Sequence, residues 1–347
     1  MVTLGTDSHK QSHTLVAVDE QGRKLGELRV DATPAGHAEA LSWARHWSDR
    51  RWAMENCRQL SRGLEQDLLR AEEQVLQVSP KLMATSRRSG RQRGKSDPID
   101  ALAVARVALR EADLPAARLE GTSRELKLLV DHREDLVGER TRVQNRLHWY
   151  LHELEPGHGV GKRGLTRKVV MAELRRRLEA HDGVVAEIVR DLIERMTELT
   201  IRVNQLQRRI EASTAELAPN LMRMAGCAGL TSGKLLAETG DVRRFRSSSA
   251  FAMHNGTAPI PVWSGNVVRH RLNRGGNRQL NVALHRIAIT QIRLGGEART
   301  YVARRMALGN TRTEAIRSLR RHLSNEVYKR LCLDSLEHLS TAETAAA

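Results

Sequence analysis

Two aspartates three residues apart, Asp97 and Asp100, follow a basic loop in the stretch Arg93-Gly94-Lys95-Ser96-Asp97-Pro98-Ile99-Asp100-Ala101. On a helix this spacing places both carboxylates on one face, close enough to share a divalent cation. Carboxylates that share a metal ion are suited to phosphate-transfer chemistry. The other interpretation is a helix cap, with Asp97 as N-cap, Pro98 as the first helical residue and Asp100 beside the helix dipole. The stretch alone favours the cap, so the rest of the chain has to decide.

The first 110 residues alternate between patterns typical of strands and patterns typical of helices. We expect strands over residues 2–6, 14–18, 24–30, 51–54 and 74–78, and helices over 34–47 and 60–72, before the helix that Asp97 opens. This order is that of an α/β RNase H-like domain, in which three antiparallel strands continue into a parallel part covered by helices.

This topology brings distant acidic residues together. Asp7 follows the first expected strand and Glu55 the fourth, and these two strands are neighbours in such a sheet. Taken singly, acidic residues at strand ends are commonly just solvated. Together with Asp97 and Asp100 they give four carboxylates at one place, which favours a metal site over a cap.

Two long heptad patterns follow this region. They cover residues 122–154, and then 185–210 with apolar residues alternating four and three apart, which predicts a coiled-coil seam. The two helices pair either within one chain or across a dimer. With 347 residues, the chain is expected to divide into a catalytic domain, a coiled-coil linker, a mainly helical basic domain and a disordered tail, over residues 1–117, 118–217, 218–332 and 333–347.

Positive charge is concentrated in the C-terminal third. The formal net charge is +16, and residues 223–331 hold 20 Lys and Arg against 5 Asp and Glu. Such an excess is the electrostatic footprint of a nucleic-acid partner. The residues expected to contact nucleic acid are Arg87, Arg88, Arg91, Arg93 and Lys95 in the first basic loop, and Arg269, Arg271, Arg274 and Arg278 in the last third.

Composition limits the cellular setting. Three widely spaced cysteines, Cys57, Cys227 and Cys332, form no CxxC pair and predict neither a disulfide framework nor a zinc site. No apolar run approaches the roughly 20 residues that span a bilayer. We therefore expect a cytoplasmic protein with no membrane partner.

Two stretches of the basic third leave alternatives open. Gly226-Cys227-Ala228-Gly229-Leu230 is either a degenerate helix-hairpin-helix that binds phosphates or an ordinary tight turn between core helices. Further on, a Gly/Pro-rich loop carries Ser264 just before the arginine-rich segment. Locally, nothing distinguishes this serine from Ser247, Ser248 or Ser249.

At this point the chain resembles the transposases, or recombinases, of the insertion sequence 110 type. Gly5-Thr6-Asp7, Met54-Glu55 and Lys95-Ser96-Asp97-Pro98-Ile99-Asp100-Ala101 are similar to the family's three acidic motifs. The C-terminal block of the family is matched by Gly256 to Pro259, Ser264-Gly265 and Arg274 to Leu280.

The resemblance implies a RuvC-like domain in which Asp7, Glu55, Asp97 and Asp100 bind Mg²⁺, with Mn²⁺ as the possible substitute. It also implies that Ser264 attacks DNA as the nucleophile, and that a structured non-coding RNA pairs with donor and target DNA. The protein would act at the nucleoid as a homo-oligomer, either a dimer or a tetramer. Two other classes keep part of this chemistry: a structure-selective nuclease that uses water, and a non-catalytic nucleic-acid-binding protein.

Overall fold

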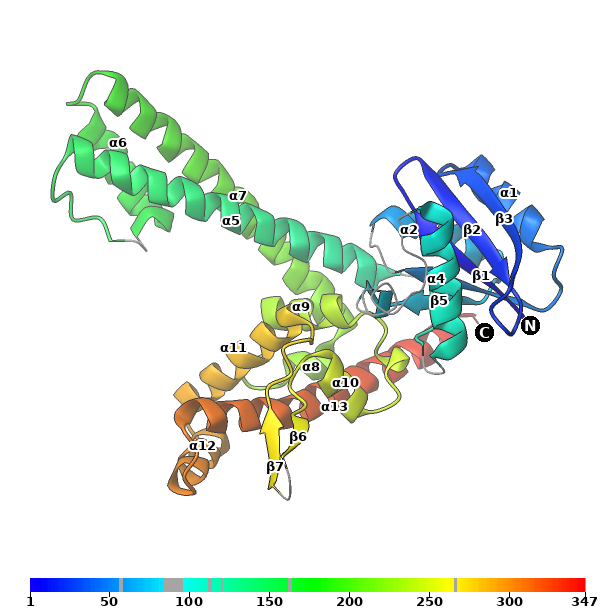
Figure 1. Ribbon diagram of the computed structural model, residues 1–347. Helices are drawn as coiled ribbons and strands as arrows, with labels where there is room; N and C mark the ends of the chain where they lie inside the picture. The colour runs from blue at the N-terminus through cyan, green and yellow to red at the C-terminus, as the bar shows by residue number, and fades with distance from the viewer. Residues whose placement is uncertain are drawn as a thin grey trace. The chain divides into compact units, whose positions relative to one another are not determined.

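The computed structural model describes residues 1–55, 59–80, 82–83, 96–111, 114–119, 121–161, 164–264 and 267–346. The chain divides into two compact units, Met1–Glu120 and Gly121–Ala347 (Figure 1). Among the described residues, no helix combines the length and the apolar character that crossing a membrane would require.

The first unit is built on a five-stranded sheet in the order β3-β2-β1-β4-β5. Its strands are β1 (Val2–Ser8), β2 (Ser12–Val18), β3 (Lys24–Asp31), β4 (Arg50–Glu55) and β5 (Val75–Val78). β2 is antiparallel to both β1 and β3, whereas β4 is parallel to β1 and β5 is parallel to β4. The predicted RNase H-like arrangement is confirmed.

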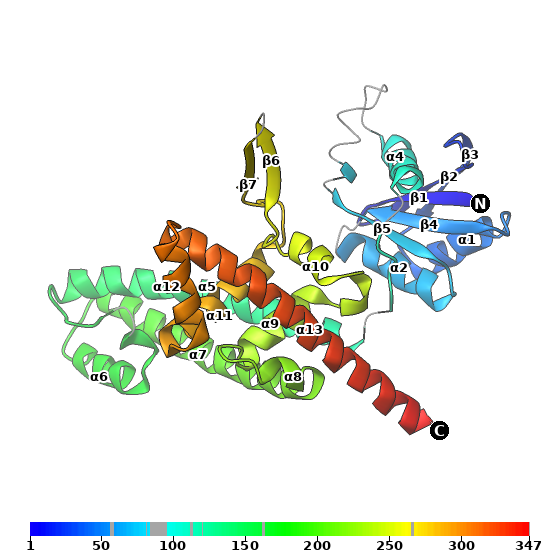
Figure 2. The same cartoon turned by 90° about the horizontal axis from the view of Figure 1, so that it is seen from below.

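Helices cover both faces of this sheet. Helices α1 (Pro34–Ala44) and α2 (Gln59–Arg70) lie on one face, and α4 (Asp97–Arg110) crosses the other (Figure 2). Alternate residues of each strand serve the two faces. Leu15 of β2 packs in the core under α1 and α2, while Val16 packs against Ala101 and Ala105 of α4.

The second unit begins with two long helices, α5 (Thr122–Leu154) and α7 (Val184–Leu217), that pack against each other along their length (Figure 1). At the end of the pair, η1 (Gly164–Thr166) and α6 (Lys168–Leu178) complete a core that includes the buried Leu147 and Leu199. Of the two alternatives for the heptad seam, the structure shows pairing within one chain.

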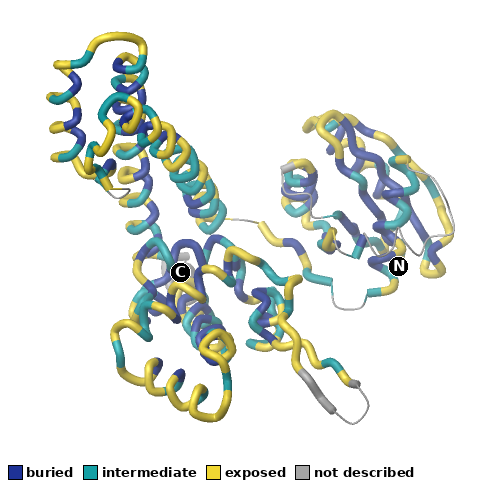
Figure 3. The backbone as a smooth tube through the Cα atoms, turned by 60° about the vertical axis from the view of Figure 1, so that its left-hand side comes forward, coloured by how far each residue is buried: buried dark blue, intermediate teal, exposed yellow. Residues whose placement is uncertain are grey.

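The basic third of the chain is mainly helical, as predicted. After α7 come α8 (Pro219–Met222), α9 (Gly229–Thr239), η2 (Val242–Arg244), α10 (Ser248–His254), the hairpin β6 (Ile260–Ser264) and β7 (Val267–Arg271), and then α11 (Arg278–Leu294), α12 (Glu297–Ala307) and α13 (Arg312–Ala346). Leu235, Phe251 and Leu284 lie fully buried at its centre, where Figure 3 shows dark blue segments.

Glycines of α9 serve helix packing. A side chain at Gly229 would lie 2.6 Å from Glu211 Cγ of α7, and one at Gly233 would lie 2.7 Å from Thr214 Oγ1. Both glycines let α9 approach α7 closely. This favours the tight-turn alternative for residues 226–230 over a phosphate-binding hairpin.

The segment predicted as a disordered tail, 333–347, instead continues α13 as far as Ala346. Asp334, only 2% exposed, accepts hydrogen bonds from the backbone N–H groups of Asn220 at 2.8 Å and Leu221 at 3.2 Å. Its carboxylate satisfies the first amides of α8, which have no partner within that helix. This contact holds the start of the tail, at Asp334, against α8.

Candidate functional site

The sheet places Asp7 and Glu55 next to each other on the face that α4 covers. Thr6 of β1 is in register with Met54 of β4, so Asp7 and Glu55 each lie one residue beyond that pair. Ala53 packs in the core under α4, and the alternation of β4 directs Glu55 to the same face. The prediction that these two strand ends are neighbours is confirmed.

Helix α4 lies unusually close to β1, because β1 has a glycine where the helix crosses it. A side chain at Gly5 would lie 2.2 Å from the carbonyl oxygen of Ala101 and 2.6 Å from the backbone nitrogen of Ala105. Gly5 is two residues before Asp7, so the same close contact brings the start of α4, with Asp97 and Asp100, to the end of β1.

The capping interpretation of Asp97 is wrong. The N-cap of α4 is Ser96, whose side chain makes no capping hydrogen bond, and Asp97 and Pro98 are the first two residues of the helix. The Asp97 carboxylate lies beside His9 instead, with Oδ1 at 3.3 Å from Nε2. Asp100, one turn on, is buried.

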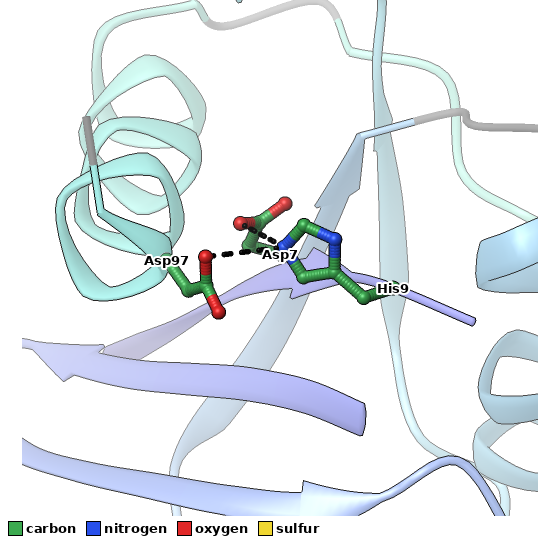
Figure 4. A group of neighbouring side chains, drawn as sticks. All are labelled: Asp7, His9 and Asp97. Carbon is green, nitrogen blue, oxygen red and sulfur yellow. Dashed lines mark hydrogen bonds and ion pairs between the residues drawn. The ribbon is translucent and has the colours of Figure 1, made fainter. Parts of the chain in front are cut away.

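A three-residue group forms at this point: Asp7, His9 and Asp97 (Figure 4). His9 Nε2 lies 3.1 Å from Asp7 Oδ2, and one ligand atom from each residue lies within 4.8 Å of the other two. The sequence-based prediction missed His9, because it rested on carboxylates alone. The signal was the two-residue spacing from Asp7, which in an extended chain puts both side chains on one face.

The electrostatics of this group favour a cation. Burial raises the pKa of Asp7, and the nearby Asp100 and Asp97 raise it further, while His9 opposes the shift. Carboxylates that repel one another in a half-buried place are stabilised by a divalent cation. Carboxylate oxygens are also the ligands that Mg²⁺ and Mn²⁺ prefer. The residues present therefore fit such an ion.

The raised pKa of Asp7 predicts that metal binding releases a proton. A carboxyl group has to ionise before it binds a cation, so the affinity for Mg²⁺ or Mn²⁺ should fall as the pH is lowered through the raised pKa of Asp7. Calorimetric titration of the metal-free protein in buffers of different ionisation enthalpy measures both the affinity and the protons released.

In the metal-free protein, the raised pKa of Asp7 should make the free energy of unfolding depend on pH. Because the folded-state pKa of Asp7 is raised, its contribution to the free energy of unfolding is greatest at low pH and decreases as the pH rises through the raised pKa. Asp7→Asn should remove this dependence, and Glu39→Gln, at an exposed position of α1, should retain it. If the free energy of unfolding of the Asp7→Asn protein fell by the same amount over this pH range, the effect would belong to another group.

Gly5→Ala tests how closely α4 must approach the sheet. The added methyl group should push α4 away and cost about 1–3 kcal/mol of stability, with weaker metal binding because Asp97 and Asp100 move from Asp7. Denaturant unfolding and metal titration measure the two effects. Gly26→Ala is the matched control, because its methyl group would meet side-chain rings and no backbone, with Trp43 at 3.3 Å and Trp47 at 3.6 Å. If Gly5→Ala bound the metal as tightly as the wild-type protein does, the close approach of α4 would not be needed for metal binding.

Ser264 lies in a hairpin rather than in the loop predicted for it. It is the last residue of β6, in register with Val267 of β7. Arg271, Arg274 and Arg278 are exposed after the hairpin. The side chains of Ser264 and Arg269, and the whole of the basic loop with Arg87, Arg88, Arg91, Arg93 and Lys95, lie outside the described residues.

The base of the hairpin is held by backbone contacts. A side chain at Gly276 would lie 2.2 Å from the backbone nitrogen of Gly256, so the two strands of chain leaving the hairpin touch directly. Asn277 donates its backbone N–H to the His254 carbonyl at 2.6 Å, and its side chain accepts from the first amides of α11. The hairpin therefore leaves the helical body from a fixed base.

Comparison with known proteins matches both units. A family model described as a transposase matches residues 4–156, and one described as the transposase IS116/IS110/IS902 family matches residues 218–303. The insertion element IS116 44.8 kDa protein of Streptomyces clavuligerus is 26% identical, over 92% of each chain. The insertion element IS900 42 kDa protein of Mycobacterium paratuberculosis is 24% identical, over 99% of each chain.

Among solved structures, T. thermophilus RuvC in complex with a Holliday junction substrate matches with a TM-score of 0.27 and 17% identity, over 34% of this chain and 99% of that one. The two family models lie in the order that the motifs predict, and together they cover most of the chain. The chain belongs to the IS110 family of insertion-element transposases.

Proposed function

We propose that this transposase cuts and rejoins DNA strands with Asp7, Glu55, Asp97 and Asp100 holding Mg²⁺, or Mn²⁺ in its place, and with Ser264 as the nucleophile. The observation that carries the proposal is the gathering of Asp7, His9 and Asp97 at the end of β1, with Asp100 close enough to raise the pKa of Asp7. In support, Glu55 lies at the end of the neighbouring strand β4, and Asp100 lies one turn after Asp97.

Each residue has a defined task. When bound, the divalent cation polarises the scissile phosphate and stabilises the leaving oxygen. The Ser264 hydroxyl attacks phosphorus, and the bond from phosphorus to the neighbouring nucleotide oxygen breaks. That oxygen gains the proton, and the new phosphoserine ester keeps the bond energy that strand rejoining needs.

The segment after Ser264 suits a DNA partner. Arg271, Arg274 and Arg278 are exposed, and guanidinium groups bind phosphate oxygens in pairs. Trp263, adjacent to Ser264 in β6, is 69% exposed and offers a ring on which a base can stack. Arg269 and the basic loop before α4 belong to the same proposed surface.

Other parts of the proposal rest on the family resemblance. They are a structured RNA that pairs with donor and target DNA, a dimer or tetramer, and action at the nucleoid. Since the acids lie in the first unit and Ser264 in the second, the two units have to meet in the working assembly, within one protomer or between protomers.

The experiment that tests the whole proposal combines the protein, the RNA that co-purifies with it and DNA carrying the ends of its element. With Mg²⁺ we expect cleaved and rejoined strands and a covalent protein–DNA adduct, and with EDTA we expect binding without either product. Cleavage without adduct would instead identify a nuclease that uses water. Equal binding in both conditions with no cleavage would identify a binding protein.

A further inference from the structure

The apolar seam of α5 is interrupted by two arginines. At seven-residue spacing the helix carries Leu126, Arg133, Arg140, Leu147 and Leu154. Leu126 and Leu147 are buried and Leu154 is partly buried, so the two arginines occupy positions where their neighbours are leucines. A charged residue in a coiled-coil seam lowers stability. Two in succession call for an explanation outside the packing of α5 on α7.

Arg133 makes one hydrogen bond and leaves a buried N–H without an acceptor. Its Nη2 donates to Gln207 Oε1 of α7 at 3.1 Å, and its Nε is buried with no partner. The neighbouring carboxylates are engaged elsewhere, because Glu134 accepts from Lys234 Nζ at 2.7 Å and Glu211 accepts from Gln207 Nε2 at 2.9 Å. A buried guanidinium N–H without an acceptor is costly.

A third arginine joins the pair from another helix. Arg286 of α11 lines a narrow cleft between α5, α9 and α11, together with Lys234, its ion-pair partner Glu134, and Gln279. Burial lowers the pKa of Arg133, and Arg140 and Arg286 lower it further, against the opposing effect of Glu134 and Glu211. Within the described part of the chain, neither Arg140 nor Arg286 forms an ion pair. Arg286 therefore lies near Arg133, because it shares the cleft with the adjacent Glu134, and Arg140 follows about two turns further along α5.

We propose that Arg133, Arg140 and Arg286 form a binding site for the phosphate backbone of a nucleic acid, separate from the hairpin that carries Ser264. Guanidinium groups bind phosphate oxygens two at a time. Seven residues of helix extend about 10.5 Å, which is about three nucleotides of one strand at 3.4 Å each. This length fits a polymer rather than a single phosphate ion. The site takes no part in the strand chemistry, so its test does not depend on Ser264 or on the metal.

The test measures how binding depends on salt, with EDTA present so that no strand is cut. The triple variant Arg133→Gln, Arg140→Gln, Arg286→Gln is titrated with duplex DNA and with single-stranded RNA of equal length. For each phosphate that the variant no longer neutralises, the slope of log affinity against log salt should decrease by about 0.9 on the duplex or about 0.7 on the single strand. A smaller slope with only one of the two nucleic acids identifies that one as the source of the phosphates. Wild-type slopes with both DNA and RNA would overturn the proposed site.

The matched control removes three arginines from α6 and α7, as Arg175→Gln, Arg176→Gln, Arg202→Gln, and has the same net charge as the triple variant. All three arginines are exposed. The salt slopes of this control variant should stay at the wild-type values. An equal decrease in the control would mean that only total charge matters, and the site would be rejected.

A second variant separates binding from folding. Arg133→Leu with Arg140→Leu completes the leucine heptad, so the thermal midpoint should stay or rise, because well-packed apolar residues commonly replace buried charges without loss. The salt slope should still decrease, by the amount expected for about two phosphates. A wild-type slope in this variant would assign the arginines to the fold and overturn the proposal.

Discussion

Asp97→Asn is expected to abolish strand cleavage. The substitution removes one negative charge from the cluster of carboxylates where α4 meets the end of β1. It should lower the cleavage rate by about 10³-fold or more, which corresponds to roughly 4 kcal/mol of transition-state stabilisation. The fold should survive, because Asp97 is not the N-cap of α4 and is a half-buried residue at its first turn. Gel assays of strand cleavage, with circular dichroism of the variant, measure both.

A control acid distinguishes a metal ligand from a general loss of charge. Asp31→Asn changes an exposed carboxylate of β3 in the same unit and should leave cleavage unchanged. In the Asp97→Asn protein, Mn²⁺ should also bind more weakly, as seen by electron paramagnetic resonance of the free ion. A folded Asp97→Asn protein that cuts DNA at the wild-type rate would remove this residue from the site.

Ser264→Ala is expected to eliminate both the covalent protein–DNA adduct and the recombined product. The substitution removes a single oxygen, while the exposed Arg271, Arg274 and Arg278 remain, so DNA and metal binding should persist. If Ser264 is the nucleophile, the ester cannot form without its hydroxyl, and activity should fall by about 10⁴-fold or more. Denaturing gels of labelled DNA reveal the adduct, and mass spectrometry of the linked peptide identifies the modified residue.

Nearby serines provide graded controls. Ser249 is exposed in α10, so Ser249→Ala should form adduct at the wild-type rate. Ser247 caps α10 by accepting the Ala250 N–H at 3.2 Å, so Ser247→Ala should cost about 1 kcal/mol of stability yet keep the adduct. Ser248→Ala should keep it as well. A linked residue other than Ser264 would overturn the assignment.

The first unit was predictable because each level of its sequence indicates the same fold. Alternation in β1 and β2, the turn between β2 and β3, and the helical period of α1 each limit the local structure. The parallel pairing of β1 with β4 then follows from topology alone, and it places Asp7 beside Glu55. Local pattern and long-range pairing both follow from the division into buried and exposed faces.

The details of the site were less predictable, because they depend on atoms distant in sequence. Whether Asp97 caps α4 or faces the sheet is decided by the close contact of Gly5 with Ala101, which the residues around Asp97 do not reveal. His9 joins the group only because the turn after β1 keeps its ring beside α4.

The hairpin was mistaken for a loop because of its prolines. Pro261 lies within β6, in register with His270. Proline cannot donate a hydrogen bond and is tolerated only at the edges of sheets, but both strands of a two-stranded hairpin are edges. The composition that argued against a strand is therefore compatible with one here. The tail was mistaken for disorder because its anchor, Asp334, finds its partners more than a hundred residues earlier.

That anchor has a consequence for the synthesis of the protein. The first amides of α8 at Asn220 and Leu221 are buried against a carboxylate that the ribosome adds more than a hundred residues later. Until Asp334 leaves the exit tunnel, these N–H groups need water or a chaperone, since a buried unpaired donor costs about 1–3 kcal/mol. A nascent chain halted before this residue holds every acid and Ser264 but an unfinished second unit.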